Sequence, residues 1–310
     1  MTDPAPGDAV SLGRRVIEGT QPGPTVLIVG GIHGDEYEAM AAIRRLIQIL
    51  EPPSLRGRVV LIPVVNEPAY WHGQRTADDG LDLARTCPGR ADGSVTERIA
   101  HAVSAEIRAA DALLDLHSGG IAMRMCPTAG YMLHPDPAVL EMQRRLARAF
   151  GLPIIWGTTS RLEGRTLSVA RDAGIPALYC EWMGAGECDP AGVEAYVQGC
   201  LNVLGELGVV GPRPAPPPPR YVVEDDRDGA GHLQVNYPAP FAGFFEPCVE
   251  LEQPVRPGDR LGVLHDLLGD RREEIRSTQT GIVLCLQVNP PIGEGDSVAA
   301  ILELSEGQMP

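Results

Sequence analysis

The strongest constraint on the fold of this chain is an alternation of short apolar runs and longer amphipathic stretches between about residues 25 and 209. The apolar runs have the length of buried strands and lie at 25–31, 58–66, 112–118, 153–158 and 175–182. The stretches between them have helical periodicity and lie at 37–50, 96–110, 136–150, 164–174 and 190–208. Strands that alternate with helices predict an α/β fold, with a mixed, mostly parallel sheet flanked by helices on both faces.

A proline-rich segment, GPRPAPPPPR at 211–220, interrupts this pattern. Six of its ten residues are proline, which favours a stiff, extended linker. Beyond it the helical period disappears, and short apolar segments alternate with turns rich in Gly, Pro and Asp, a pattern typical of a small β barrel or sandwich. We therefore predict an α/β domain over 1–210, a linker over 211–220 and a small, barrel-like all-β domain over 221–310.

The charge and composition exclude several classes of function. A formal net charge of −15 without any basic cluster argues against nucleic acid and anionic membrane surfaces as partners. The absence of lysine excludes Schiff-base, Walker-type and lipoyl-lysine chemistry. Seven scattered cysteines without a CxxC pair, and an N-terminus without a signal-peptide pattern, predict a cytoplasmic protein. The sequence leaves open whether it forms a homo-oligomer.

Side chains that can bind a metal ion or transfer a proton follow three of the predicted strands. His33 comes after the run at 25–31, His117 ends the run at 112–118, and Glu181 lies near the end of the run at 175–182. In α/β sheets, ligands bind beyond the carboxyl ends of the strands. We expect these three side chains to converge on one crevice.

His33 and Glu36 have the spacing H-x-x-E. Three residues apart in the first turn of a helix, both side chains would lie on one face and reach one cation. With His117 they form a His₂Glu set, the usual ligand set of a catalytic zinc site with one open position, and Asp115 is placed to orient His117. On the residues alone, Asp35 and Glu36 fit equally well as acids that favour a helix start, so both interpretations remain open.

Four segments in order add a family resemblance: GGIHGDE, NEPAYWHGQRTADDGLDLARTCPG, DALLDLHSGG and IPALYCEWMGAG. Together they resemble the succinylglutamate desuccinylase/aspartoacylase family, a branch of the zinc carboxypeptidase superfamily, over nearly the whole chain. Within that family, PIIWGT, IPALYCEWMGAG and AGFFEP are more similar to members of the N-acetyl-diaminobutyrate deacetylase type than to mammalian aspartoacylase. The resemblance implies a zinc-carboxypeptidase-like fold for the α/β domain.

The resemblance also implies roles for particular residues. It implies one zinc ion per chain, held by His33, Glu36 and His117. Glu181 would be the general base and acid that assists attack by zinc-bound water, and Arg75 would polarise the scissile carbonyl. Arg85 would receive a substrate carboxylate, but Ala84 stands where the family usually has asparagine, so the amide hydrogen bonds of that residue are missing. Arg165 and Arg171 precede Glu181 closely enough to face the same pocket.

The predicted function is therefore that of a zinc-dependent amidohydrolase. Its partner would be a small-molecule N-acyl amino acid or derivative, from which it removes a small acyl group such as acetyl. Ala84 motivates an alternative, a metallocarboxypeptidase or esterase with the same site. A non-catalytic protein that binds an acyl amino acid is a further alternative, against which the complete set of expected catalytic residues argues.

Overall fold

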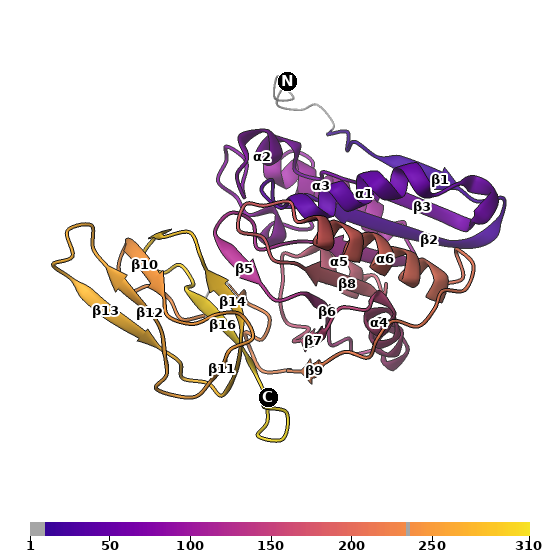
Figure 1. The fold of residues 1–310 in the computed structure, drawn as a ribbon. Helices are drawn as coiled ribbons and strands as arrows, with labels where there is room; N and C mark the ends of the chain where they lie inside the picture. The colour runs from indigo at the N-terminus through magenta and orange to yellow at the C-terminus, as the bar shows by residue number, and fades with distance from the viewer. Residues whose placement is uncertain (1–9, 234–235) are drawn as a thin grey trace.

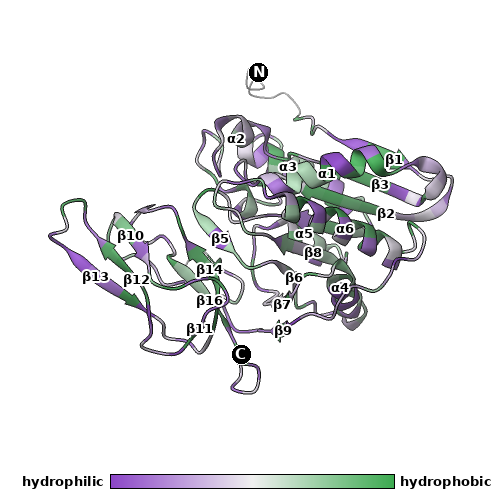
Figure 2. Cartoon of the chain, in the orientation of Figure 1, coloured by the Kyte–Doolittle hydropathy of each residue, from purple (hydrophilic) through white to green (hydrophobic). Residues whose placement is uncertain are grey.

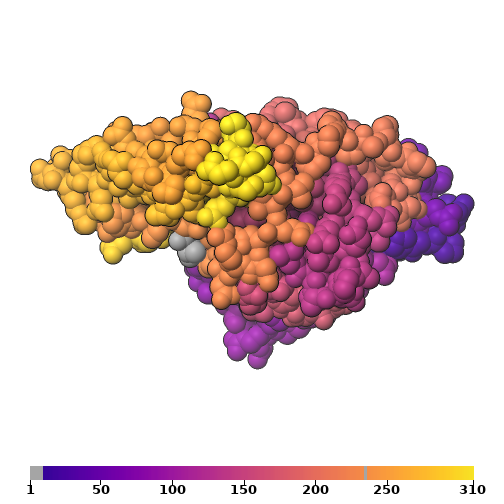
Figure 3. All heavy atoms as spheres, turned by 90° about the horizontal axis from the view of Figure 1, so that it is seen from below, coloured from indigo at the N-terminus to yellow at the C-terminus, as the bar shows by residue number. Residues whose placement is uncertain are grey.

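The computed structural model describes residues 10–233 and 236–310 and shows two lobes (Figures 1 and 3). The larger lobe contains an eight-stranded sheet in the order β1–β3–β2–β4–β8–β6–β7–β9. Its strands are β1 (Arg15–Glu18), β2 (Gln21–Gly30), β3 (Arg56–Ile62), β4 (Ala112–Leu116), β6 (Thr128–Met132), β7 (Ile154–Thr158), β8 (Ala177–Glu181) and β9 (Tyr221–Glu224). Only the pairs β1/β3 and β6/β8 are antiparallel, so the prediction of a mixed, mostly parallel sheet is confirmed.

Helices cover both faces of this sheet (Figure 1). They are α1 (Tyr37–Ile49), α2 (Glu67–His72), α3 (Val95–Arg108), α4 (Pro137–Phe150), α5 (Thr166–Asp172) and α6 (Pro190–Glu206). In β2, Val26 and Ile28 belong to the core that also contains residues of α1, α4 and α6, whereas the alternate residues Leu27 and Val29 belong to the core that contains residues of α3 and α5. Because successive side chains of a strand point to opposite faces, a continuously apolar run is what a strand buried on both sides requires. Figure 2 shows these central strands as hydrophobic.

The smaller lobe consists of two antiparallel sheets. One has the order β13–β12–β10–β15, and in the other β14 pairs with β11, β16 and β5. The strands are β5 (Met123–Met125), β10 (Gly243–Pro247), β11 (Pro254–Val255), β12 (Arg260–His265), β13 (Arg272–Arg276), β14 (Gly281–Gln287), β15 (Pro291–Ile292) and β16 (Ala299–Glu303). Phe245 and Leu264 from the first sheet share a core with Val283 and Ile301 from the second.

The two lobes exchange strands. β9, which directly follows the proline-rich segment, pairs in parallel with β7 at the edge of the large sheet. In the other direction, β5 leaves the first half of the chain to pair with β14 of the small lobe. Tyr221–Glu224 thus belong to the large sheet although they follow the expected linker; the division at 210 and 220 stays a prediction.

An apolar cluster crosses the junction between the lobes. Ile154, Trp156 and Tyr221 of the large sheet pack with Ile282 and Leu284 of β14. Within the described residues, no helix combines the length and apolar character needed to span a membrane.

We predict that thermal unfolding occurs in a single cooperative transition. Exchanged strands and a shared apolar cluster mean that neither lobe can unfold without exposing the core of the other. Differential scanning calorimetry of the metal-free protein would measure this directly. Two resolved transitions, with one lobe still folded between them, would contradict the prediction.

Candidate active site

The expected convergence of three strand ends is present in the structure. β2, β4 and β8 are adjacent and parallel, and Gly30 pairs with Leu116, which in turn pairs with Cys180. The carboxyl ends of all three strands therefore lie at one edge of the sheet. His33, His117 and Glu181 extend from this edge and line one cavity.

His33 and Glu36 lie side by side, but in a different local backbone structure from the one expected. Helix α1 begins at Tyr37, and Glu36 is its N-cap with extended backbone angles, φ −110° and ψ 91°. The pair therefore occupies the turn before the helix, and not its first turn. Gly31 has a φ of +62°, which favours glycine, and lets the chain leave β2 sharply.

A second glycine fixes the position of this turn. Gly34 lies against the backbone of α2, where an added Cβ would be 2.1 Å from the carbonyl carbon of Ala69. Asn66, the N-cap of α2, accepts a hydrogen bond from the Ala69 N–H at 3.3 Å. The side-chain amide of Asn66 donates to the Ile32 carbonyl at 3.5 Å. The two glycines and Asn66 thus hold His33 in place through α2.

Glu36 lies between two imidazoles. One carboxylate oxygen is 2.7 Å from Nδ1 of His33, and the other is 2.9 Å from Nδ1 of His117 and accepts the Ser118 N–H at 3.2 Å. Burial would raise the pKa of Glu36, but the two histidines outweigh it and hold the pKa well below its usual range. All three residues are buried, and their ligand atoms lie within 4.8 Å of one another. The described residues contain no other such group of His, Cys, Asp or Glu.

The far nitrogens of both imidazoles face carboxylates. Nε2 of His33 is 3.1 Å from Asp82, and Nε2 of His117 is 3.1 Å from Asp115. Asp115 is itself held by the Thr166 hydroxyl. Carboxylates behind ligating histidines are a regular feature of protein metal sites, because they orient the ring and increase its basicity. The arrangement fits a divalent cation bound by His33, Glu36 and His117.

Asp82 was not singled out from the sequence, although it lies in the segment DLARTCPG. It caps the short 3₁₀ turn Leu83–Arg85 and accepts two hydrogen bonds from Arg75, at 3.0 and 3.3 Å. Burial opposes ionisation of Asp82, but His33 and Arg75 hold its pKa well below the usual range. Asp82 therefore positions one metal-ligand candidate and Arg75 together. The sequence feature that could have identified Asp82 is its position two residues before Ala84, in the same segment.

Glu181 is in a very different environment from Glu36. Burial raises its pKa to about 8, and the charges of Glu36 and Asp115 add to this, while His117 and Arg75 partly oppose it. Two carboxylates in one cavity thus have pKa values that are pushed apart. That separation is typical of sites in which one acid is held ionised and the other exchanges a proton near neutral pH.

Arginines supply the positive charge of the cavity. Nη1 of Arg75 is 3.7 Å from Glu36, and Arg85 and Arg165 both line the wall. Burial and the neighbouring Arg165 lower the pKa of Arg85 to about 10, and burial also lowers that of Arg165. Two half-buried guanidinium groups in proximity suit an anion such as a carboxylate. Arg171, by contrast, pairs with Glu163 and Asp172.

The cavity has a volume of about 510 Å³ and is lined by both lobes. This volume is in the range of small-molecule sites. Its wall combines Ala84 and Met132 of the large lobe with Met123, Cys285 and Gln287 around β5 and β14.

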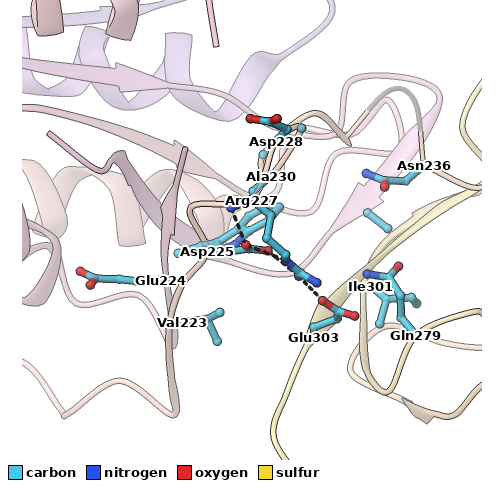
Figure 4. Close-up of a pocket in the computed structure, with 14 residues that line it drawn as sticks. Val223, Glu224, Asp225, Arg227, Asp228, Ala230, Asn236, Gln279, Ile301 and Glu303 are labelled. Carbon is cyan, nitrogen blue, oxygen red and sulfur yellow. Dashed lines mark hydrogen bonds and ion pairs between the residues drawn. The ribbon is translucent and has the colours of Figure 1, made fainter. Parts of the chain in front are cut away.

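A second cavity of about 560 Å³ lies between β9, the segment after it and β16 (Figure 4). Its single arginine, Arg227, is paired with Asp225 at 2.6 Å and also with Glu303. It shares only Gly231 with the first cavity, and none of the metal-ligand candidates lines it. The chemistry is therefore expected in the first cavity.

The comparisons agree with this site and fold. Residues 22–207 match the model of the succinylglutamate desuccinylase/aspartoacylase catalytic domain, and the chain belongs to this family. N-alpha-acetyl-L-2,4-diaminobutyric acid deacetylase of Halomonas elongata is 31% identical over 92% of this chain and 83% of the relative.

Solved structures extend the likeness to both lobes. The succinylglutamate desuccinylase/aspartoacylase from Rhodobacter sphaeroides has a TM-score of 0.84 and 30% identity, covering 96% of this chain and 90% of that one. The product-bound ectoine utilization protein EutE (DoeB) from Ruegeria pomeroyi has a TM-score of 0.84 and 28% identity, covering 94% of this chain and 88% of that one.

We predict that Asp82→Asn lowers the affinity for zinc by about 10- to 100-fold, because it removes the carboxylate that orients His33. Competition with a chromophoric chelator would measure the dissociation constant. Asp78→Asn is the matched control, since Asp78 is exposed and its ion pair is with His72, away from the metal-ligand candidates. Equal zinc affinities for the two variants would contradict the assigned role of Asp82.

We also predict that Glu181→Gln stabilises the metal-free protein at alkaline pH. A carboxyl group whose pKa rises from 4.5 to about 8 on folding holds its proton more tightly in the native state. The stability of the native state therefore falls as the pH rises between these two pKa values. A glutamine does not ionise, so the variant does not lose this stability. The difference in Tm between variant and wild type should be larger at pH 8.5 than at pH 5. A difference that does not change with pH would show that Glu181 ionises normally.

Proposed function

We propose that the protein is a zinc-dependent amidohydrolase that removes a small acyl group, acetyl being the first choice, from an N-acyl amino acid or derivative. The observation that carries the proposal is the presence in one cavity of the His33–Glu36–His117 group and the buried Glu181 with its raised pKa. Membership of the family supports it, as does the deacetylase named among the relatives.

His33, Glu36 and His117 would hold the zinc ion. When bound there, zinc polarises the acyl carbonyl and makes water more acidic. Glu181 would take the proton of the attacking water as general base, and its pKa of about 8 suits this exchange near neutral pH. As the amide bond breaks, the same carboxyl group would return the proton to the leaving amine. Glu36, ionised between two histidines, has no part in proton transfer.

Arg75 would stabilise the negative charge that develops on the carbonyl oxygen. Its hydrogen bonds to Asp82 fix the guanidinium beforehand, so little reorganisation is needed during the reaction. Arg85 and Arg165 would bind the substrate carboxylate. Ala84 also lines this part of the cavity and offers no side-chain hydrogen bond, which leaves the two arginines to do this alone.

The division into domains and the cellular compartment are part of the same proposal. We propose a carboxypeptidase-like α/β domain over 1–210 and a barrel-like domain over 221–310, whose first strand, β9, is lent to the sheet of the large lobe. All seven cysteines are unpaired, which supports a reducing, cytoplasmic compartment.

Ala84 supports a second candidate, a carboxypeptidase or esterase that uses the same residues. Weaker anchoring of a free carboxylate would admit peptide or ester substrates. Cleavage of C-terminal residues from peptides, without deacylation of N-acyl amino acids, would favour this candidate.

We predict that the zinc-loaded protein releases free amine from N-acetyl amino acids and that chelation abolishes the release. Glu181→Gln should retain one zinc per chain and lose at least about 100-fold in kcat, because general acid–base catalysis contributes about this much. Glu187→Gln, an exposed acid in the following loop, is the control and should keep full activity. Full activity of a zinc-loaded Glu181→Gln protein would refute the mechanism.

A further inference from the structure

Tyr179 lies in the wall of the first cavity, on the same strand as Glu181. It is two residues before Glu181 in β8, so both side chains point to the same face of the sheet, and both line the cavity. Two residues of a strand span about 7 Å. A group bound at Tyr179 therefore lies at a distance from Glu181 that suits a small N-acyl amino acid, with the acyl group at one end and the carboxylate at the other.

The neighbouring strand β6 leaves room for the tyrosine ring, because it has a glycine at this point. β6 runs antiparallel to β8, and Gly130 pairs with Tyr179. A Cβ added at Gly130 would be 2.1 Å from Cζ of the tyrosine and 2.4 Å from its hydroxyl oxygen. The ring therefore crosses β6 at Gly130. Met132, the next residue on this face of β6, also lines the cavity, so the hydroxyl end of the ring lies along the cavity wall.

The hydroxyl group of Tyr179 is a donor without a protein partner among the described residues. Tyr131 and Tyr196, by contrast, donate their hydroxyl protons to protein oxygens. Tyr179 is half-buried, and its oxygen is not among the unpaired polar atoms that are shut away from solvent. Burial and the charge of Glu181 raise the pKa of Tyr179 well above its usual range, so the group keeps its proton. It can therefore donate a hydrogen bond to a ligand in the cavity.

Arg165 is the cationic neighbour of this hydroxyl group. Burial lowers the pKa of Arg165, and among the groups that oppose this effect the Tyr179 oxygen is the strongest. Gly164 holds Arg165 next to Arg85: its φ is +78°, and an added Cβ would be 2.3 Å from the Arg85 carbonyl oxygen. Two guanidinium groups and a phenol thus line one part of the cavity. An anion there would accept charge-assisted hydrogen bonds from all three.

We propose that the Tyr179 hydroxyl group binds the substrate carboxylate together with Arg165, and so supplies a donor that Ala84 cannot. This inference rests on the proposed function, with the substrate carboxylate at Arg85 and Arg165. Tyr179 binds substrate and sets the distance between the carboxylate and the amide bond that is cleaved; it takes no part in proton transfer. Gly130 is a positioning residue that acts through the tyrosine ring.

The test compares N-α-acetyl-L-2,4-diaminobutyrate with its primary carboxamide, which has nearly the same shape but lacks the negative charge. For the zinc-loaded wild type we expect kcat/KM to favour the carboxylate by at least about tenfold. Tyr179→Phe keeps the ring and removes the donor. It should reduce this preference about tenfold, because a carboxamide oxygen loses a weaker hydrogen bond than a carboxylate does. The change should appear in KM for the carboxylate with kcat nearly unchanged, as for an interaction made equally in the ground state and the transition state.

Gly130→Ala tests the same contact from the other strand. It keeps the hydroxyl group but displaces the ring, so it should reduce the preference in the same direction as Tyr179→Phe. Tyr70→Phe is the matched control and should leave the preference unchanged, since Tyr70 does not line the cavity. Because each variant is judged by a ratio of two substrates, a general loss of stability does not imitate the effect.

Binding provides a readout that does not depend on turnover. Isothermal titration of both compounds into zinc-loaded Glu181→Gln protein should show the preference for the carboxylate. Adding Tyr179→Phe to this variant should reduce the preference about tenfold, through weaker binding of the carboxylate.

Two failures can be told apart. Turnover of both substrates with equal kcat/KM in the wild type, or an unchanged preference in Tyr179→Phe, would overturn this inference and leave amide hydrolysis by the zinc site standing. Neither turnover nor binding of any N-acyl amino acid would overturn the proposed function and this inference with it.

Discussion

The buried carboxylate of Glu36 is the interaction on which the site depends. An ionised carboxylate removed from water is costly unless charges and hydrogen bonds compensate it. Here His33, His117 and the Ser118 N–H supply that compensation from two neighbouring strand ends. The glycine turn, the support from α2 and the carboxylates behind each imidazole can all be understood as holding these donors around one anion, or around one cation that replaces their protons.

Much of this arrangement could be predicted from the sequence, because the central strands are apolar on both faces. All five predicted runs form strands, and the convergence of His33, His117 and Glu181 follows from parallel neighbours. The turn that holds His33 and Glu36 could not be predicted. Its shape depends on contact between Gly34 and α2, some 35 residues away, which local periodicity does not encode.

The strands and hydrogen-bond partners that were not predicted also depend on residues far away in the sequence. β6 has the sequence TAGYM, which is not a continuous apolar run, and β9 has only four residues. Each becomes a strand because a neighbour in the sheet offers it hydrogen bonds. Asp82 reaches His33 across 49 residues through a loop whose path is tertiary. The structure also gives the small lobe a part in the site, because Cys285, Gln287 and Asp296 complete the wall around residues that the large sheet positions.

The exchange of β5 and β9 also limits how such a protein can be recombined. A small lobe taken from a relative would have to bring its own version of Met123–Met125, since these residues pair with β14 in the middle of the foreign sheet. If two parent sequences were joined at the proline-rich segment, β9 and β7 would come from different parents, although they pair in one sheet. Chimeras, and gene fusions during evolution, should therefore succeed when β5 is exchanged together with β14 and β9 is kept together with β7. Substrate range would then be inherited as a property of the junction between the two lobes.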